Sequence, residues 1–326
     1  MKRIAKITVA LLLAVAMCFS LAGCYDEDLN WSAKYDDTEL PAGAYIYYLS
    51  IAYNEAASKV STEDEVLKSE IDGTPAETWI KNRADEYVNQ YFYIQNEMKR
   101  LGLEMTDEDY STCLQTTESY WNYFGTSFEK FGIAKTSFDI AYSQYNRMYL
   151  KVFNALYGEG GENEVPESEL RQHIEDDYYD YEYFSAPLTK TDDDNKSVDL
   201  TDEEKADLKE TLEKYKTKIE SGAMTVNDAA TDYALKVQQD STYQTGIKDE
   251  NGMQSSYMPD AFISAIKEMN EGDVEVVEST KYMIVLHRLP IKDDEDTLLE
   301  SSDNRSQLLL ELKNTEYADA VSAAAQ

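Results

Sequence analysis

The apolar residues of this chain keep a helical spacing over a long stretch and then change to the spacing typical of β-strands. From residue 41 to about residue 178 they recur at three- and four-residue intervals, the period of an amphipathic helix. From Tyr178 onward aromatic residues crowd a short segment, Tyr181–Leu188, which predicts a strand. The sequence therefore predicts an α+β protein, with a helical region and a separate β-containing unit.

Start and stop signals divide the helical region. Helices are expected over residues 45–53, 80–101 and 138–156, and Gly102 ends the second of them. Thr106-Asp107-Glu108-Asp109 resembles a capping box and predicts the start of another helix. Gly125 and Gly132 predict breaks on either side of a short element, and Pro166 suits the first turn of the next helix.

The second unit has a β-α-α-β-β pattern. A strand over 181–188 is followed by a polar loop over 189–200, helices over 201–219 and 226–235, and a loop containing Gly246 and Gly252. A short helix over 259–269 and strands over 274–277 and 282–289 complete the unit. An acidic linker, 293–296, then leads to a final helix over 306–321, which we expect to return to the N-terminal helices.

The N-terminus carries an export signal. Basic residues in Met1–Lys6 precede the apolar run Ile7–Leu21, and Leu21-Ala22-Gly23-Cys24 resembles a bacterial lipobox. This predicts a signal peptide over 1–23, a diacylglyceryl (palmitate-type) anchor on Cys24, and a tether over 24–40. The alternative, a retained membrane-spanning helix, needs about 20 apolar residues, and this run is shorter. The predicted location is the extracytoplasmic side of the cell membrane.

Charge and composition exclude several functions. The formal net charge is −34, and so acidic a surface repels phosphate backbones, which argues against nucleic-acid binding. Cys113 is the only cysteine after Cys24, and His173 and His287 are far apart. No Cys/His cluster has metal-ligand spacing, so we expect no cofactor and no metal site. The acidic loop Asp192–Asp194 is expected to be solvated, although its spacing leaves cation binding open.

Several motifs of the helical region resemble the PrsA-type foldase lipoproteins, relatives of the SurA chaperones. They occur in the family's order and cover most of residues 79–180: Tyr87–Leu103, Thr106–Asp109, Phe124–Gly132 and Val165–Leu170. The resemblance implies a helical chaperone domain over 41–178 plus 297–326. A parvulin-like domain, inserted over 179–292, resembles peptidyl-prolyl isomerases.

The parvulin-like domain supplies the candidate site residues. The segment Asp228–Thr242 resembles the parvulin motif that places Asp240 at the acidic active-site position. Met258 and Phe262 resemble the pair that lines the proline pocket, and Tyr183 belongs to the neighbouring aromatic strand. The two family histidines are replaced, because the resemblance puts Ser185 and Met283 at their positions. We therefore expect prolyl isomerase activity to be weak or lost, which leaves the enzymatic assignment open.

The resemblance implies a membrane-anchored chaperone that assists the folding of unfolded or nascent secreted polypeptides. An active peptidyl-prolyl isomerase that uses other polar residues is the first alternative. A solute-binding lipoprotein is the second, although that class needs two α/β lobes and the sequence shows one small β-containing unit. Whether two copies assemble into a homodimer is left open by the residues.

Overall fold

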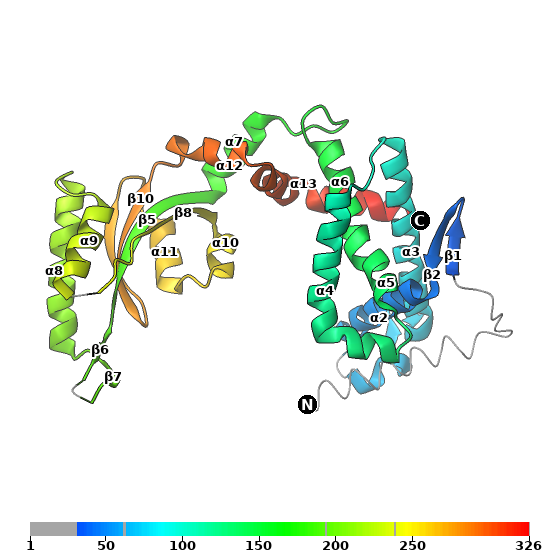
Figure 1. Ribbon diagram of the computed structural model, residues 1–326, viewed down its shortest axis with the longest axis horizontal. Helices are drawn as coiled ribbons and strands as arrows, with labels where there is room; N and C mark the ends of the chain where they lie inside the picture. Colours follow the sequence, from blue (N-terminus) through cyan, green and yellow to red (C-terminus); the bar gives the residue numbers. More distant parts are fainter. Residues whose placement is uncertain (1–30, 61–62, 193, 238, 326) are drawn as a thin grey trace. The chain divides into compact units, whose positions relative to one another are not determined.

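The computed structural model describes residues 31–60, 63–192, 194–237 and 239–325, which form an α+β protein (Figure 1). The chain divides into two compact units, unit 1 (residues up to 164 with 313–326) and unit 2 (Val165–Leu312). The domain boundaries expected near 178 and 297 fall inside unit 2. The expected signal peptide and Cys24 lie outside the described residues. Within those residues, no helix has the length and apolar character needed to cross a bilayer.

Residues 31–41 form a hairpin where the sequence predicted part of a tether. Strand β1 (Trp31–Tyr35) pairs antiparallel with β2 (Thr38–Pro41). The side chain of Leu40 is fully buried, and the Tyr35 ring centroid lies 5.9 Å from that of Phe92. Burial of Leu40 and the ring contact fix this segment to the helices, which a free tether would not allow.

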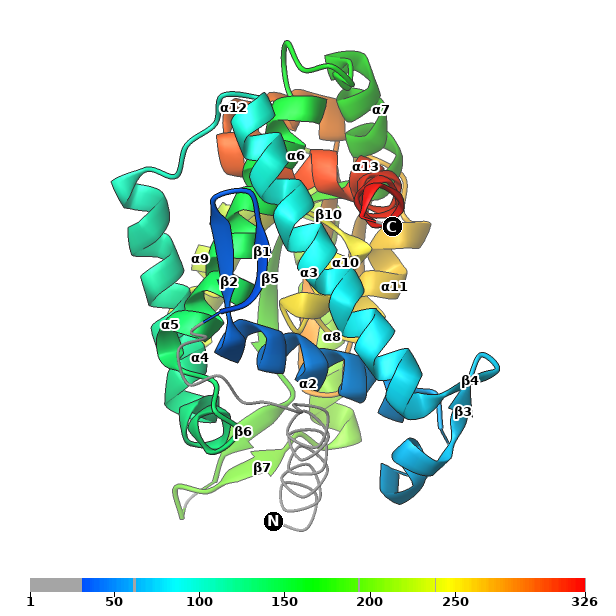
Figure 2. The same ribbon diagram turned by 90° about the vertical axis from the view of Figure 1, so that its right-hand side faces the viewer.

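Unit 1 is a helical body. Its elements are α2 (Ala42–Ser58), η1 (Glu63–Lys68), β3 (Glu70–Ile71), β4 (Thr74–Pro75), α3 (Ala76–Arg100), α4 (Asp107–Lys130), α5 (Lys135–Phe138), η2 (Asp139–Gln144), α6 (Tyr145–Tyr157) and the last part of α13 (Ser302–Ala324). Helix α3 crosses α2 (Figure 2) and also packs on α6. The return of the final helix is confirmed, because the Tyr317 ring centroid lies 5.3 Å from that of Phe153.

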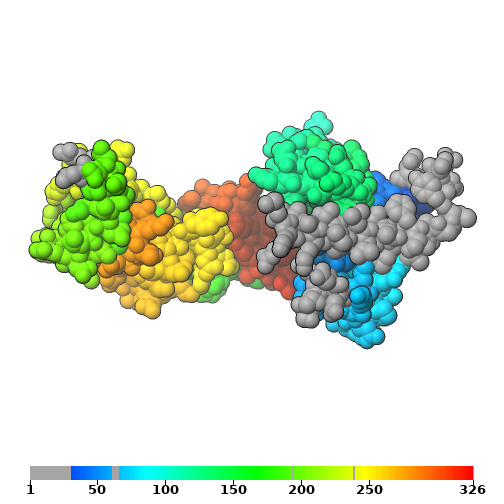
Figure 3. All heavy atoms as spheres, turned by 90° about the horizontal axis from the view of Figure 1, so that it is seen from below, coloured from blue at the N-terminus to red at the C-terminus, as the bar shows by residue number. Residues whose placement is uncertain are grey.

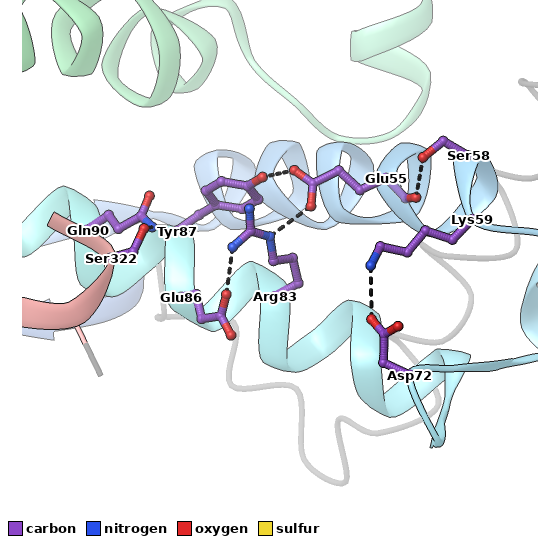
Figure 4. A network of polar contacts seen from close by, with 9 residues as sticks. All are labelled: Glu55, Ser58, Lys59, Asp72, Arg83, Glu86, Tyr87, Gln90 and Ser322. Carbon is purple, nitrogen blue, oxygen red and sulfur yellow. Dashed lines mark hydrogen bonds and ion pairs between the residues drawn. The ribbon is translucent and has the colours of Figure 1, made fainter. Parts of the chain in front are cut away.

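A polar network joins α2 to α3 (Figure 4). Glu55 of α2 accepts a 2.7 Å hydrogen bond from Arg83 Nε of α3 and another from the Tyr87 hydroxyl. Arg83 also pairs with Glu86 one turn along α3, at 2.7 Å. Since Arg83 and Glu55 are both about two-thirds covered, this pair is screened less than a surface pair and helps to fix the crossing of the two helices.

The break predicted at Gly125 is wrong, because α4 continues through this residue to Lys130. A Cβ at Gly125 would lie 2.6 Å from Nε1 of Trp121, one turn earlier on the same helix. The glycine therefore makes room for the indole ring rather than ending the helix. Gly132, with a φ of 79°, occupies the left-handed conformation that follows the real helix end.

The predicted capping box at the start of α4 forms and extends into an ion cluster. Thr106 N and Asp109 Oδ2 are 2.8 Å apart, and Asp109 N bonds in return to the Thr106 hydroxyl. The buried Asp109 carboxylate also accepts hydrogen bonds from Arg147 Nε at 2.5 Å and Lys151 Nζ at 2.6 Å. Although burial opposes ionisation, these hydrogen bonds hold the pKa of Asp109 well below its usual range.

We expect Asp109→Ala to lower the free energy of unfolding of unit 1 by about 2–3 kcal/mol, because it removes a cap and unpairs two partly covered cations. Tryptophan fluorescence during urea unfolding measures this, since Trp31, Trp79 and Trp121 all lie in unit 1. The native pKa is lowered, so the wild-type advantage should be present at pH 7 and fade below about pH 4.

Asp107→Ala is the matched control, because Asp107 is also in the first turn of α4 but is exposed. It should cost about 0.5 kcal/mol, the usual size of a helix-dipole effect. Equal losses for the two variants would show that the ion cluster does not stabilise the unit.

Unit 2 is built around an antiparallel sheet. Its elements are α7 (Glu167–Asp177), β5 (Tyr178–Pro187), β6 (Thr189–Thr191), β7 (Ser197–Asp199), α8 (Asp202–Glu220), α9 (Val226–Val237), β8 (Gln244–Asp249), α10 (Glu250–Ser255), α11 (Asp260–Glu268), β9 (Val274–Glu278), β10 (Tyr282–Leu289), η3 (Ile291–Asp293), α12 (Glu295–Glu300) and the start of α13. The strand order is β8-β5-β10-β9.

The two faces of the sheet carry separate cores. Helices α8 and α9 cover one face, and α10 and α11 cover the other (Figure 1). On the first face Phe184 and Met283 are fully buried, and on the second Phe262 and Leu286 are fully buried. Side chains alternate between the faces along each strand, so a shift of one position moves a residue from one core to the other.

Strand β8 and helix α10 were not predicted. The sequence indicated a loop here because of Gly246 and Gly252. In the structure a Cβ at Gly246 would lie 2.8 Å from the Tyr181 hydroxyl, and a Cβ at Gly252 would lie 2.8 Å from Asp249 Oδ1. Both glycines thus permit close approach inside regular elements.

Candidate functional site

Helix α4 exposes a series of large apolar side chains, which we call the aromatic surface: Tyr110, Leu114, Tyr120, Tyr123 and Phe124. Tyr123 is 84% exposed and Phe124 is 50% exposed. In the space-filling view the segment around α4 forms part of the outer surface of unit 1 (Figure 3, teal green). Apolar side chains gathered at one exposed place commonly mark an interaction site.

The aromatic surface packs on further rings, of which Phe138 is buried and Phe128 and Tyr142 are half-buried. Phe124 lies 6.1 Å from Phe128, which stacks at 5.1 Å on the buried Phe138. Tyr120 packs edge-on against Tyr142 at 4.9 Å, and the Tyr142 hydroxyl donates a 2.8 Å hydrogen bond to the Tyr120 hydroxyl. Burial and this hydrogen bond raise the pKa of Tyr142 to about 12, so the phenol stays neutral at physiological pH. The exposed rings are therefore held in place by contacts with uncharged aromatic side chains.

Helix α4 also carries exposed acidic residues. Asp107, Glu108 and Glu129 lie on the same helix and are exposed. Tyrosine combines apolar area with a hydroxyl that water can reach, so such a surface can bind apolar groups and remain soluble. The exposed rings can bind an extended segment that carries apolar side chains, and the acidic charge of the helix attracts basic ones.

The adjacent pair Tyr123-Phe124 is a sequence signal for this surface. Consecutive helix positions are about 100° apart, so an adjacent pair such as Tyr123-Phe124 cannot be buried entirely on a narrow apolar stripe. Which of these side chains are exposed follows from the packing of α4.

Three of the four residues predicted for the proline-binding site lie in one hydrophobic cluster. Tyr183, Met258 and Phe262 belong to one cluster on the α10–α11 face, and the Tyr183 and Phe262 rings are 5.2 Å apart. Phe262 is fully buried, and Tyr183 and Met258 are partly buried residues packed against its cluster. Asp240 lies in the exposed loop after α9. Within the described part of the chain, no hydrogen bond or ion pair joins Asp240 to these three residues.

The two positions assigned to the family histidines face opposite sides of the sheet. Met283 is buried against α8 and α9. Ser185 alternates with Phe184 and Ala186 of that same core and therefore faces the Tyr183 side. The Cα partner of Ser185 on β10 is Ile284, which belongs to the α10–α11 core. Met283 therefore lies on the opposite side of the sheet from Ser185, and Ile284 is the β10 residue that pairs with Ser185.

Both histidines are engaged elsewhere. His287 Nδ1 lies 2.9 Å from Glu182 Oε1, and Glu182 also accepts a 2.9 Å hydrogen bond from the Tyr243 hydroxyl. Glu182 is two positions from Phe184 on β5, and His287 is four positions from Met283 on β10, so both face the α8–α9 side. His173 is on α7, between carboxylates of Asp177 and Glu311. The His287 imidazole therefore lies on the opposite side of the sheet from Tyr183.

Tyr257 is an unusual residue beside the predicted pocket. It has a φ of 57°, its side chain is 94% exposed, and it directly precedes Met258. A left-handed conformation costs an ordinary residue about 1 kcal/mol or more, and such outliers are often retained at functional sites. The fold gives no packing reason for a tyrosine at this position.

We expect Tyr257→Gly to raise the free energy of unfolding of unit 2 by about 1 kcal/mol, since glycine adopts positive φ without strain. Slower hydrogen exchange of the α10 and α11 amides measures the gain. Gln254→Gly, in the last turns of α10, is the control and should lower stability by about 1 kcal/mol. A loss of stability in the Tyr257 variant would contradict the strain argument.

No protein-family model matches the chain, and no curated protein matches it in sequence. Solved structures of foldase protein PrsA do match. The protein from Streptococcus pneumoniae str. Canada MDR_19A is 12% identical, with a TM-score of 0.40 over 90% of this chain and 92% of that chain. The Lactococcus lactis protein is 13% identical, with a TM-score of 0.36 over 84% and 86%. The Bacillus subtilis protein is 13% identical, with a TM-score of 0.34 over 80% and 92%.

Proposed function

We propose that this chain is a chaperone, or foldase, that binds unfolded segments of secreted proteins on the extracytoplasmic side of the cell membrane. The observation that carries the proposal is the aromatic surface of α4, where Tyr123 and Phe124 are exposed and Phe124 packs against the half-buried Phe128. We propose that a lipid on Cys24 attaches the protein to the membrane.

The aromatic surface suits transient binding of many sequences. Unfolded chains expose apolar side chains, and their burial against rings supplies a driving force proportional to area rather than to one sequence. The carboxylates of Asp107, Glu108 and Glu129 add attraction for lysine and arginine. We therefore expect clients with mixed apolar and basic segments to bind most tightly and to be released by salt.

We further propose that unit 2 has weak or no prolyl isomerase activity. Twisting a prolyl bond requires polar groups arranged to favour the twisted amide over the planar one. On the Tyr183 side of the sheet, β5 and β10 offer Ser185 and Ile284 where a polar pair would be needed. The position of His287 also supports weak or absent activity, because its ring pairs with Glu182 on the α8–α9 side of the sheet.

The test is suppression of aggregation of a chemically denatured client by the full chain. An inert protein of equal size and charge is the control, and loss of suppression at high salt would support the acidic contribution. A chain that fails to suppress aggregation yet binds one small molecule tightly would favour the solute-binding alternative. All strand pairs in the described residues are antiparallel, which does not support the α/β lobes of that class.

A protease-coupled assay with an X-Pro peptide separates the chaperone from the active isomerase. We expect a rate near the uncatalysed one. A rate comparable to that of an active parvulin would overturn the proposed loss of catalysis and leave the chaperone proposal intact.

A further inference from the structure

The sheet of unit 2 ends in a strand with an open side. Strand β8 lies at the edge of the order β8-β5-β10-β9, and within the described residues β5 is its one strand neighbour (Figure 1). An edge strand presents unpaired backbone N–H and C=O groups that can pair with another extended chain. The opposite edge, β9, packs against α8 and α11.

The usual protection of such an edge is weak in β8. A lysine often blocks pairing by projecting its charge from the edge. Here the Lys248 ammonium donates a hydrogen bond to the Ser256 hydroxyl, just after α10, so its charge is turned back toward the protein. Gly246, in the middle of the strand, carries no charge that would deter pairing.

A pocket of about 450 Å³ lies at the C-terminal end of β8, between α10 and the start of α13. The residues that matter here are Lys248, Asn251, Asn304, Gln307 and Glu311. Within the described residues, the side-chain amides of Asn251 and Asn304 make no hydrogen bond, whereas Gln307 and the Tyr178 hydroxyl are bonded to Glu311. The pocket therefore offers free amides that can both donate and accept.

Free amides beside an open strand edge fit a polypeptide backbone. A backbone segment is neutral and carries alternating donors and acceptors, which Asn side chains match without regard to sequence. Its remaining groups can pair with β8 as an added strand, a common mode of peptide recognition. The volume falls in the range of about 300–1,000 Å³ that is usual for ligand pockets.

We infer that an extended segment of an unfolded polypeptide binds unit 2 as an additional strand along β8, with its end seated in the pocket formed with α10 and α13. This rests on the proposed chaperone function and adds a backbone-reading site to the aromatic surface of α4. The two sites differ in what they recognise, because one binds side chains and the other binds main-chain groups.

Hydrogen exchange of the full chain with a short capped peptide of alternating valine and threonine tests the inference. Pairing should slow exchange of the amides of residues 244–249 about tenfold at saturation, while residues 274–278 of β9 stay unchanged. The same peptide with N-methyl groups on alternate residues keeps its side chains but loses donors, so it should bind about tenfold more weakly.

The double substitution Asn251→Ala and Asn304→Ala should weaken binding of the unmodified peptide about tenfold. Asn227→Ala, an exposed asparagine on α9, is the control and should have no effect. Equal binding of the methylated peptide, or protection confined to β9 or α4, would overturn the inference. If the chain suppresses aggregation while β8 remains unprotected, this inference alone fails; if it suppresses no aggregation, the proposed function fails.

Discussion

The double substitution Tyr123→Ser and Phe124→Ser is expected to weaken client binding about thirtyfold, because truncating each aromatic anchor costs roughly 1 kcal/mol or more. The effect should appear as a matching increase in the chaperone concentration that halves aggregation of a denatured client. Tyr123 is 84% exposed, so its removal costs the folded chain little packing. Phe124 loses contacts with Tyr120 and Phe128, so stability must be measured together with activity.

Leu235→Ser with Tyr282→Ser is the matched control. Both side chains are large, apolar and exposed, and both belong to unit 2. If exposed apolar area anywhere on the chain were sufficient, this variant would lose activity to the same extent. Retained suppression in the control and loss in the α4 variant would assign binding to the aromatic surface. Full activity of the α4 variant would contradict the proposed site.

Local signals in the sequence predicted the local structure well. Thr106 and Thr201 form capping boxes with the residues three positions later, as their spacing predicts. Gly102 follows the end of α3 with a φ of 66°. These features depend on hydrogen bonds within a few residues, so neighbouring sequence is sufficient to specify them.

Features that depend on distant packing were not predictable in the same way. Gly125 reads as a helix break, but its role is set by the ring of Trp121. The loop expected around Gly246 is a strand because β5 supplies its hydrogen bonds. The face of Met283 depends on strand register, where a shift of one residue exchanges the two cores. The family resemblance predicted that Tyr183, Met258 and Phe262 lie close together, but it did not predict how far each is exposed.

The largest expected effect of pH concerns Asp180, at the start of β5. Its side chain is 4% exposed, and Oδ2 has no hydrogen-bond partner among the described residues. Burial first, and then the neighbouring Asp294 carboxylate, raise the pKa of Asp180 to about 7. In the unfolded chain an aspartate titrates near pH 3.9. The folded state therefore holds a proton between about pH 4 and pH 7 that the unfolded state has released.

The sign of the effect follows from this difference in bound protons. The contribution to stability is fully present below about pH 4. It is lost as pH rises to 7, by about 4 kcal/mol at 1.36 kcal/mol per pKa unit. Asparagine resembles the protonated acid in shape and can donate to Asp294. We therefore expect Asp180→Asn to raise the free energy of unfolding of unit 2 by about 3 kcal/mol at pH 8 and to change it little at pH 4. Hydrogen exchange of the slowest β5 amides measures this in unit 2 alone.

Asp294→Asn separates the two causes of the raised pKa. This variant removes the neighbouring negative charge but leaves Asp180 buried. Because burial is the larger cause, the pH dependence should become smaller without disappearing, and the gain at pH 8 should be less than that of Asp180→Asn. Equal gains would assign the effect to charge repulsion. An unchanged pH profile in the Asp180 variant would show that this carboxyl group does not hold the proton.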